Sequence, residues 1–263
     1  MEKVRWRGTW GVGDAMQALN VCHNYCNKNN VKVNLEMHWE HDDNHLTHPD
    51  DPETIIQRME WIHTQYHRQN DVVITHVYNS DLFPSGNLNP DKDKHRFYFD
   101  SKSFRPNSAP PNDWIFKKSA FIKSPKKVVY WTPVHNSEPP RRWKRFLTND
   151  DWYDIIKLLS GEGWIPVELT YRTPIDEAFK EIQEADIVVC YDGMWHFIAR
   201  NFAKPMFVPS WEGITNYNTP NAVKRKNREE VKKFFNKFPK GVREMRDRAL
   251  RHKVKIERYY HED

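Results

Sequence analysis

A short apolar run passes directly into the start of a helix at Asp186-Ile-Val-Val-Cys-Tyr-Asp-Gly-Met-Trp-His196. The run from Asp186 to Cys190 is typical of a buried strand, and apolar residues at helical spacing follow from Gly193 to Phe202. Lys204-Pro205 ends this helix, and Met206 to Val208 is a further apolar run. A strand, a helix and a second strand in such close succession predict a parallel α/β unit.

The turn after the first of these strands is a candidate ligand site. In open α/β sheets, ligands bind at the carboxyl ends of the strands. The N-terminus of a helix binds phosphate through its unpaired N–H groups. Asp192 and Gly193 occupy that position, and His196 follows in the first turn of the predicted helix. We therefore expect these three residues beside a diphosphate, and the alternative for His196 is a histidine packed in the core.

The alternation of strands and helices continues towards both ends of the chain. Strands are predicted at 4–6, 31–39, 72–75, 127–131 and 164–169, and helices at 14–28, 52–66, 149–161 and 173–182. Residues 79–118 show no periodic pattern and are interpreted as a long irregular region. The tail from residue 221 is interpreted as helical, with an interruption at Pro239-Lys240-Gly241. The two α/β runs predict two domains, residues 1–122 and 123–263.

Three glycines mark the turn after the first predicted strand, in Gly8-Thr-Trp-Gly-Val-Gly-Asp14. Small residues let a ligand approach the backbone, and a helix that begins at Asp14 offers unpaired N–H donors to an anion. The dinucleotide fingerprint is absent, because Gln17 and Ala18 stand near the place of its third glycine. The alternative is a tight turn in which Asp14 only caps the helix. The candidate ligand-binding residues of this turn are Thr9, Trp10, Gly11 and Gly13.

A basic element follows the predicted strand 127–131. Arg141-Arg-Trp-Lys-Arg145 holds four cations in five residues. Arginine binds phosphate oxygens in bidentate fashion, so we interpret Arg142 and Lys144 as a phosphate clamp. The alternative is a solvated loop.

The positive charge is concentrated near the C-terminus. The chain of 263 residues has a net charge of +5. Residues 222–258 contain fifteen Lys and Arg against five Asp and Glu, a charge of +10, so the remainder carries −5. Such a stretch faces phosphate, nucleic acid or an anionic lipid surface, or it is a solvated helix face.

The cysteines and the apolar runs indicate an intracellular chain. No apolar run has the form of a signal peptide or the length of a membrane span, so we expect a cytoplasmic protein. Cys22, Cys26 and Cys190 are too few for a disulfide framework and are interpreted as buried thiols.

Histidines and aspartates crowd the end of the predicted strand 31–39. They are His38, His41, Asp42, Asp43, His45 and His48. These residue types can bind a metal, but the segment looks like a polar loop, so no pair has the i, i+4 setting on a helix that zinc proteases use. We interpret the segment as a loop that binds an acceptor substrate, because it follows the carboxyl end of a strand. We assign no metal ligands.

Together, the glycine turn, the basic-Trp element and the Asp-Gly turn resemble glycosyltransferase family 9, the heptosyltransferases. That family opens with a strand, a G-x-x-GD turn and a helix, which residues 8–19 match. Its second domain opens with a strand, a basic-Trp loop and a helix, which residues 128–159 match. It ends with a strand, an Asp-Ser-Gly-Pro-Met-His-like turn, an Ala-rich helix and Lys-Pro, which residues 186–208 match. The order and spacing of all three elements agree.

The resemblance implies a fold and a reaction. The fold is two Rossmann-like α/β domains facing a cleft (GT-B), with a short N-terminal domain and a helical basic C-terminal tail. The reaction is a metal-independent, inverting transfer from a nucleotide sugar, which is a substrate and not a cofactor, with Asp14 as general base. The implied donor-binding residues are Thr132, Arg142, Lys144, Asp192, Gly193 and His196. The implied acceptor-side residues are Thr9, Trp10, Gly11 and Gly13.

The chain departs from the family pattern at three places. The Asp192–His196 motif is one residue shorter than usual, residues 79–118 have no counterpart, and the usual Gly-rich donor loop reads Thr132-Pro-Val-His135. The acceptor therefore stays open between a glycan or lipopolysaccharide sugar and a modified DNA base. The rival interpretation is a non-enzymatic α/β protein that binds nucleic acid through its basic C-terminal helices.

Overall fold

The computed structural model describes residues 1–8, 12–39, 52–66, 71–78, 96–99, 126–131, 147–170, 173–190, 194–209, 222–225 and 227–261. The chain divides into two compact units, Met1–Lys117 and Lys118–Asp263, called below the N-terminal and the C-terminal unit. The domain boundary predicted at 122/123 lies outside the described residues. Both units combine parallel strands with helices, so the predicted α/β class is confirmed.

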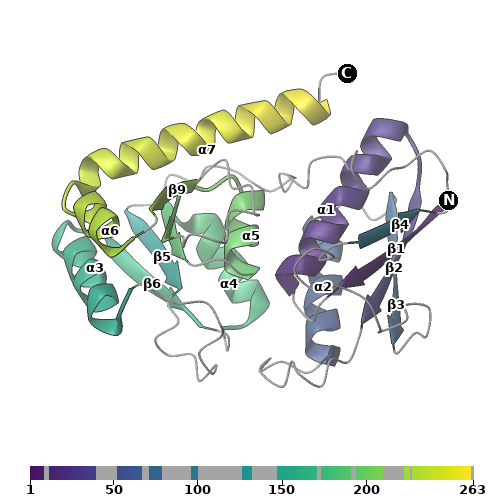
Figure 1. Cartoon of the computed structure of the whole chain (residues 1–263), viewed down its shortest axis with the longest axis horizontal. Coiled ribbons are helices and arrows are strands. Elements are labelled where there is room, and N and C mark those ends of the chain that lie inside the picture. Colours follow the sequence, from purple (N-terminus) through teal and green to yellow (C-terminus); the bar gives the residue numbers. More distant parts are fainter. Residues whose placement is uncertain are drawn as a thin grey trace. The chain divides into compact units, whose positions relative to one another are not determined.

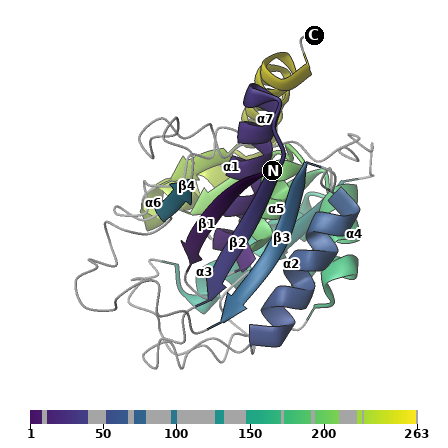
Figure 2. The ribbon, with the colours of Figure 1, turned by 90° about the vertical axis from the view of Figure 1, so that its right-hand side faces the viewer.

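The N-terminal unit is built on a four-stranded sheet (Figure 2). Its elements are β1 (Glu2–Gly8), α1 (Val12–Asn29), β2 (Val33–Trp39), α2 (Pro52–Tyr66), β3 (Val72–Tyr78) and β4 (Arg96–Phe99). The strand order is β3-β2-β1-β4. The first three strands are parallel, and β4 runs antiparallel to β1 at the edge.

Alternation along β2 determines which face of this sheet the helices cover. Leu35 and Met37 are fully buried on the face that contacts α1. Glu36, between them, lies on the opposite face and pairs with Lys3 of β1 at 2.7 Å. The period of two thus separates an apolar face under the helices from a polar face.

The C-terminal unit is built on a five-stranded sheet in which every strand pair is parallel. Its elements are β5 (Lys127–Trp131), α3 (Asn149–Gly161), β6 (Ile165–Leu169), α4 (Ile175–Glu184), β7 (Ile187–Cys190), α5 (Met194–Asn201), β8 (Met206–Pro209), β9 (Ala222–Arg225), α6 (Arg228–Phe235) and α7 (Phe238–His261). The strand order is β6-β5-β7-β8-β9. This is a doubly wound order, and its direction reverses between β5 and β7.

Aromatic side chains form the core on one face of this sheet, which α3, α6 and α7 cover, while α4 and α5 lie on the other side (Figure 1). The rings of Phe207 and Phe234 stack with centroids 4.4 Å apart. Trp164 meets Phe238 of α7 edge to face at 5.6 Å. Since such contacts bury large apolar surfaces, the basic C-terminal helices are an integral part of this unit. Among the described residues, no helix has the length and apolar character needed to cross a membrane.

Two strands lie where the sequence analysis predicts none. β4 falls inside the segment interpreted as irregular, residues 79–118, and pairs with β1. β9 falls inside the tail interpreted as helical and pairs with β8, which buries Val223 completely. Both strands have four residues, too few to display a period of their own, and partner strands define them.

One predicted helix start and the predicted position of the break in the helical tail are also wrong. α1 begins at Val12, so Gly13 and Asp14 lie in its first turn, and Asp14 is not the cap. α3 covers Asn149–Gly161, as predicted, and its cap is Thr148. The predicted interruption of the helical tail is present but lies at residues 236–237, between α6 and α7, rather than at 239–241. Pro239 stands in the first turn of α7, where a backbone N–H has no partner within the helix.

Candidate functional site

The reversal of strand order brings two of the predicted site segments to the same edge of the C-terminal sheet. Trp131, the last residue of β5, is the register partner of Cys190, the last residue of β7. The chain therefore leaves both strands side by side, one residue before Thr132 and two before Asp192. Ligands of doubly wound sheets bind at such a switch point. Thr132, Arg142, Lys144, Asp192 and Gly193 themselves lie outside the described residues.

Two helices, α3 and α5, follow these two strands, and the N-terminus of α3 is already occupied by its own side chains. The hydroxyl of Thr148 accepts a hydrogen bond from the Asp151 amide at 3.2 Å. The Asp151 carboxylate accepts one from the Thr148 amide at 2.9 Å. Asp150 adds a second acid to the same turn. The Thr148 hydroxyl and the Asp151 carboxylate thus satisfy two N–H donors. Both acids offset the positive end of the helix dipole, so a further anion is repelled there.

The N-terminus of α5 differs in charge. Its first turn contains no acidic residue. The helix has eight residues, and every residue from Trp195 to Asn201 is buried. The body of the helix is therefore fixed in the core of the unit, and no acid of its own first turn offsets the positive end of its dipole. Of the two helices at the switch point, α5 is the better place for a diphosphate.

His196 is the one predicted donor-binding residue that the structure describes. It lies in the first turn of α5, as expected, and is 1% exposed. Its ring meets that of Phe197 with centroids 4.9 Å apart. The imidazole is thus packed in the core of the unit, which is the alternative given for it above.

Arg200 and Asn201 are buried polar residues of α5 that the sequence analysis does not single out. Arg200 stands four residues after His196, so the two share a face of the helix. Burial lowers the pKa of Arg200 to about 10, which leaves the guanidinium charged at neutral pH. The i, i+4 spacing of His196 and Arg200 is visible in the sequence, but the burial of Arg200 is not.

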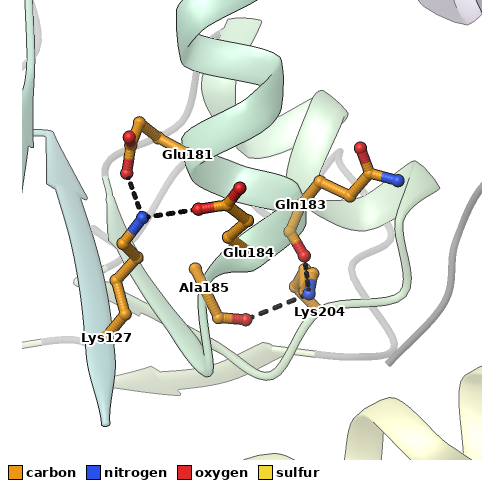
Figure 3. Close-up of polar contacts among 6 residues, drawn as sticks. All are labelled: Lys127, Glu181, Gln183, Glu184, Ala185 and Lys204. Carbon is orange, nitrogen blue, oxygen red and sulfur yellow. Dashed lines mark hydrogen bonds and ion pairs between the residues drawn. The ribbon is translucent and has the colours of Figure 1, made fainter. Parts of the chain in front are cut away.

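Lys204 belongs to the Lys-Pro element of the family resemblance. Its side chain caps the C-terminal end of helix α4 (Figure 3). Its ammonium donates hydrogen bonds to the carbonyl oxygens of Gln183 at 2.5 Å and Ala185 at 3.0 Å. Burial lowers the pKa of Lys204 to about 8. Because the last carbonyls of a helix have no partner within it, this buried amine supplies one. Lys204 precedes β8 and so stands at the amino ends of the strands, opposite the edge where the donor is predicted.

A second lysine binds the same end of α4. The ammonium of Lys127 lies 2.6 Å from a carboxylate oxygen of Glu181 and 2.9 Å from one of Glu184 (Figure 3). Burial alone would lower the pKa of Lys127, but these two hydrogen bonds outweigh it and the pKa is raised. Both lysines are therefore explained by the packing of α4.

In the N-terminal unit, the predicted base lies close to the carboxyl end of a central strand. β1 ends at Gly8 and α1 begins at Val12, so Asp14 is the third residue of the helix after this strand. Gly13 precedes it in the same turn. Thr9, Trp10 and Gly11, and the side chain of Asp14, lie outside the described part of the chain.

The three cysteines are free and buried, as predicted. Burial raises the pKa of the Cys22 thiol well above its usual value and that of Cys26 to about 12. The Cys26 thiol donates a hydrogen bond to the Asp71 carbonyl at 3.3 Å. At neutral pH both thiols are protonated and unreactive.

The predicted loop of histidines and aspartates, residues 41–48, lies outside the described residues. His38 belongs to β2. Within the described ranges, no three His, Cys, Asp or Glu side chains come together as metal ligands.

No family model matches the chain, and no curated protein matches it. Among solved structures, an iron-containing dodecameric glycosyltransferase, TibC from enterotoxigenic E. coli, superposes with a TM-score of 0.46 and 10% identity over 84% of this chain. The chain spans 62% of the length of TibC. E. coli heptosyltransferase WaaC with ADP superposes with a TM-score of 0.44 and 11% identity, covering 90% of this chain and 99% of that one. With TM-scores of 0.46 and lower, the backbones agree only loosely, and the candidate site rests on the strand order and helix ends described above.

Proposed function

We propose that the chain is a glycosyltransferase that moves a sugar from a nucleotide-sugar donor to an acceptor hydroxyl. The observation that carries this proposal is the pairing of Trp131 with Cys190 at the switch point of the C-terminal sheet. It joins the starts of the two segments in which the sequence analysis predicts a phosphate clamp and a diphosphate turn. The α5 N-terminus beside them has no acidic residue in its first turn.

In the proposed site, the donor diphosphate binds at the N-terminus of α5, next to Asp192 and Gly193. Its negative charge interacts with the helix dipole and with the backbone N–H groups of the first turn. Arg142 and Lys144 come from the segment after β5. Arg142 binds two phosphate oxygens at once, and Lys144 binds as a point charge. Thr132 and His196 complete the donor side.

The proposed reaction is an inverting displacement at the anomeric carbon. The acceptor oxygen forms a bond to that carbon while the bond from the carbon to the diphosphate oxygen breaks. The electron pair of the broken bond leaves with the nucleoside diphosphate, whose developing charge Arg142 and Lys144 stabilise. The hydroxyl proton passes to the carboxylate of Asp14 as general base. These cationic side chains take the role that a metal ion has in other transferases.

The acceptor in this proposal is a glycan or lipopolysaccharide sugar, or a modified DNA base. The glycine turn of Thr9, Trp10, Gly11 and Gly13, which follows β1, lies on the acceptor side. We propose that the enzyme acts in the cytoplasm, where nucleotide sugars are made.

A thermal-shift panel of nucleotide sugars and nucleoside diphosphates tests the donor proposal. A ligand at one hundred times its Kd stabilises the folded state by about 2.7 kcal/mol, which raises the Tm of a chain of this size by roughly 5–10 °C. Arg142→Ala should remove most of the shift, whereas Lys180→Ala on the exposed face of α4 should keep it. A panel in which no nucleotide shifts the Tm, or a shift that Arg142→Ala leaves unchanged, would refute the proposed donor site.

Asp14→Asn tests the chemical step separately. Asparagine is nearly isosteric and is tolerated in the first turn of a helix, but it does not accept a proton. Turnover should fall by about 10²–10⁴-fold, the usual contribution of a general base, while the donor-induced Tm shift stays. Near-native turnover in this variant would show that the base lies elsewhere.

A further inference from the structure

Helix α7 has one buried stripe and one face that points away from the C-terminal unit. The buried stripe consists of Phe238, Val242, Met245, Ala249 and His252, which pack over β8 and β9. In Figure 1 the helix runs along one side of the C-terminal unit. The residues opposite this stripe, called below the outer face of α7, are Lys240, Arg243, Asp247, Leu250, Arg251 and Val254.

The outer face exposes two aliphatic side chains. Leu250 is 55% exposed and Val254 is 38% exposed. They are four residues apart and therefore adjacent on the helix surface. Contact with water is unfavourable for both, so a partner that covers them gains binding free energy.

Among the residues that the structure describes, the cations of the outer face have no acidic partner, unlike several other cations of the C-terminal unit. Five cations of the C-terminal segment pair with carboxylates, namely Arg225, Arg228, Lys232, Arg246 and Arg248. Among the described residues, Lys240, Arg243 and Arg251 form no ion pair. Asp247 is the single acid on the outer face, which leaves it with a net positive charge.

We propose that the outer face of α7 binds the surface of an anionic phospholipid membrane. Such a surface offers phosphates for the arginines at the depth where Leu250 and Val254 can enter the boundary between headgroups and acyl chains. The long arginine side chains reach back to the headgroup layer while the aliphatic pair is buried. Nucleic acid would take up the cations but would leave the aliphatic pair against a hydrated phosphate backbone. The combination of exposed aliphatic and unpaired cationic residues therefore favours lipid.

The expected strength follows from the charge. Each lysine or arginine near an anionic leaflet raises the association constant by about fivefold at physiological salt. Replacing both arginines by glutamine should therefore weaken binding by about 20- to 30-fold. Replacing Leu250 and Val254 by glutamine should weaken it by a factor of about 10, because the aliphatic insertion is lost.

Vesicle co-sedimentation of the full chain at about 150 mM salt tests the proposal. The probes are vesicles of phosphatidylcholine alone and vesicles in which about one third of the lipid is phosphatidylglycerol. The variants are Arg243→Gln/Arg251→Gln and Leu250→Gln/Val254→Gln. The matched control is Lys157→Gln/Lys180→Gln, which removes two exposed lysines from α3 and α4. All three variants change exposed residues and should keep the native Tm.

We expect binding to the anionic vesicles alone, weakened in both α7 variants and unchanged in the lysine control. Absent binding, equal binding to the neutral vesicles, or an equal loss in the lysine control would overturn the proposal. So would a DNA fragment that binds more tightly than the anionic vesicles and loses affinity with the arginine variant but not with the aliphatic one. That last result would identify nucleic acid as the partner.

Discussion

The carboxylate of Asp151 joins two helices of the C-terminal unit, and its removal gives the sharpest stability prediction. It is 2% exposed. One oxygen accepts a hydrogen bond from the Thr148 amide at 2.9 Å and caps α3. The other lies 2.8 Å from a guanidinium nitrogen of Arg228 and 3.4 Å from the ammonium of Lys232, both on α6. Asp151→Asn keeps the size and the cap but removes the charge that holds α6.

The size of the effect follows from the pKa. Burial alone would raise the pKa of Asp151, but the hydrogen bonds from Arg228 and Thr148 outweigh it and lower the pKa from 3.8 to about 2. That fall corresponds to roughly 2.5 kcal/mol in favour of the ionised folded state. Water screens part of it, because Arg228 is 47% and Lys232 is 42% exposed. We therefore expect Asp151→Asn to lower the free energy of unfolding by about 1–2 kcal/mol at neutral pH.

Urea unfolding at neutral pH measures this loss, and Asp150→Asn is the control. Asp150 is an exposed acid in the same turn of α3, so its replacement removes a dipole interaction of about 0.5 kcal/mol and no buried ion pair. Since the folded pKa lies below the unfolded one, the contribution of Asp151 is complete above about pH 4 and is lost as the pH falls towards about 2. Arg228→Gln should destabilise the native chain but have little effect on Asp151→Asn. The reasoning fails if Asp151→Asn is no more destabilising than Asp150→Asn, or if the effect of Arg228→Gln is the same in both backgrounds.

Two further perturbations test the core of each unit. Burial lowers the pKa of His63 and of His76 below 6.5. The folded chain therefore binds fewer protons than the unfolded chain below that pH, and the free energy of unfolding should fall between about pH 7 and about pH 5. Urea unfolding across this range should show that the free energy of unfolding depends less on pH in His63→Gln than in the native chain. An equal pH dependence in both would contradict the lowered pKa of His63. In the C-terminal unit, a Cβ at Gly241 would lie 2.5 Å from the ring of Phe234. In Gly241→Ala, overpacking should therefore lower the free energy of unfolding by about 1–3 kcal/mol. The higher helix propensity of alanine offsets about 1 kcal/mol of that loss. Gly161→Ala is the control, because no atom lies within 4 Å of the added Cβ, and it should change the Tm little. Equal Tm values for the two variants would rule out the clash at Gly241.

Periodic apolar residues determine which parts of the fold were predictable. Leu35 and Met37 alternate with polar residues, and the run before Cys190 is continuously apolar, so both strands were predicted from their own residues. β9 reads Ala-Val-Lys-Arg, which fits the charged helices around it equally well. Its identity as a strand comes from β8, which pairs with it and buries Val223. Tertiary pairing overrides local propensity in such short segments.

The site was predictable at the level of segments and not of side chains. The sequence placed the basic element and the Asp-Gly turn after strands, but only the strand order makes these two strands neighbours. The burial of Arg200 and the role of Lys204 depend on packing between helices that lie apart in the chain. No pattern in a single segment records such contacts.

The choice between α3 and α5 as the anion-binding helix shows how local and tertiary information combine. Acids in the first turn of α3 are visible in the sequence, but exposed acids can move aside for a phosphate. Asp151 cannot do so without losing its bonds to Arg228, which is 77 residues away in the chain. A phosphate at the N-terminus of α3 would therefore have to displace the carboxylate that pairs with Arg228 and Lys232, which costs about 1–2 kcal/mol. At the N-terminus of α5 no first-turn acid has to be displaced. At the switch point, one helix end is thus neutralised by an internal carboxylate, and the other has no acid in its own first turn. This difference is the reason why the proposed donor site places the diphosphate at α5.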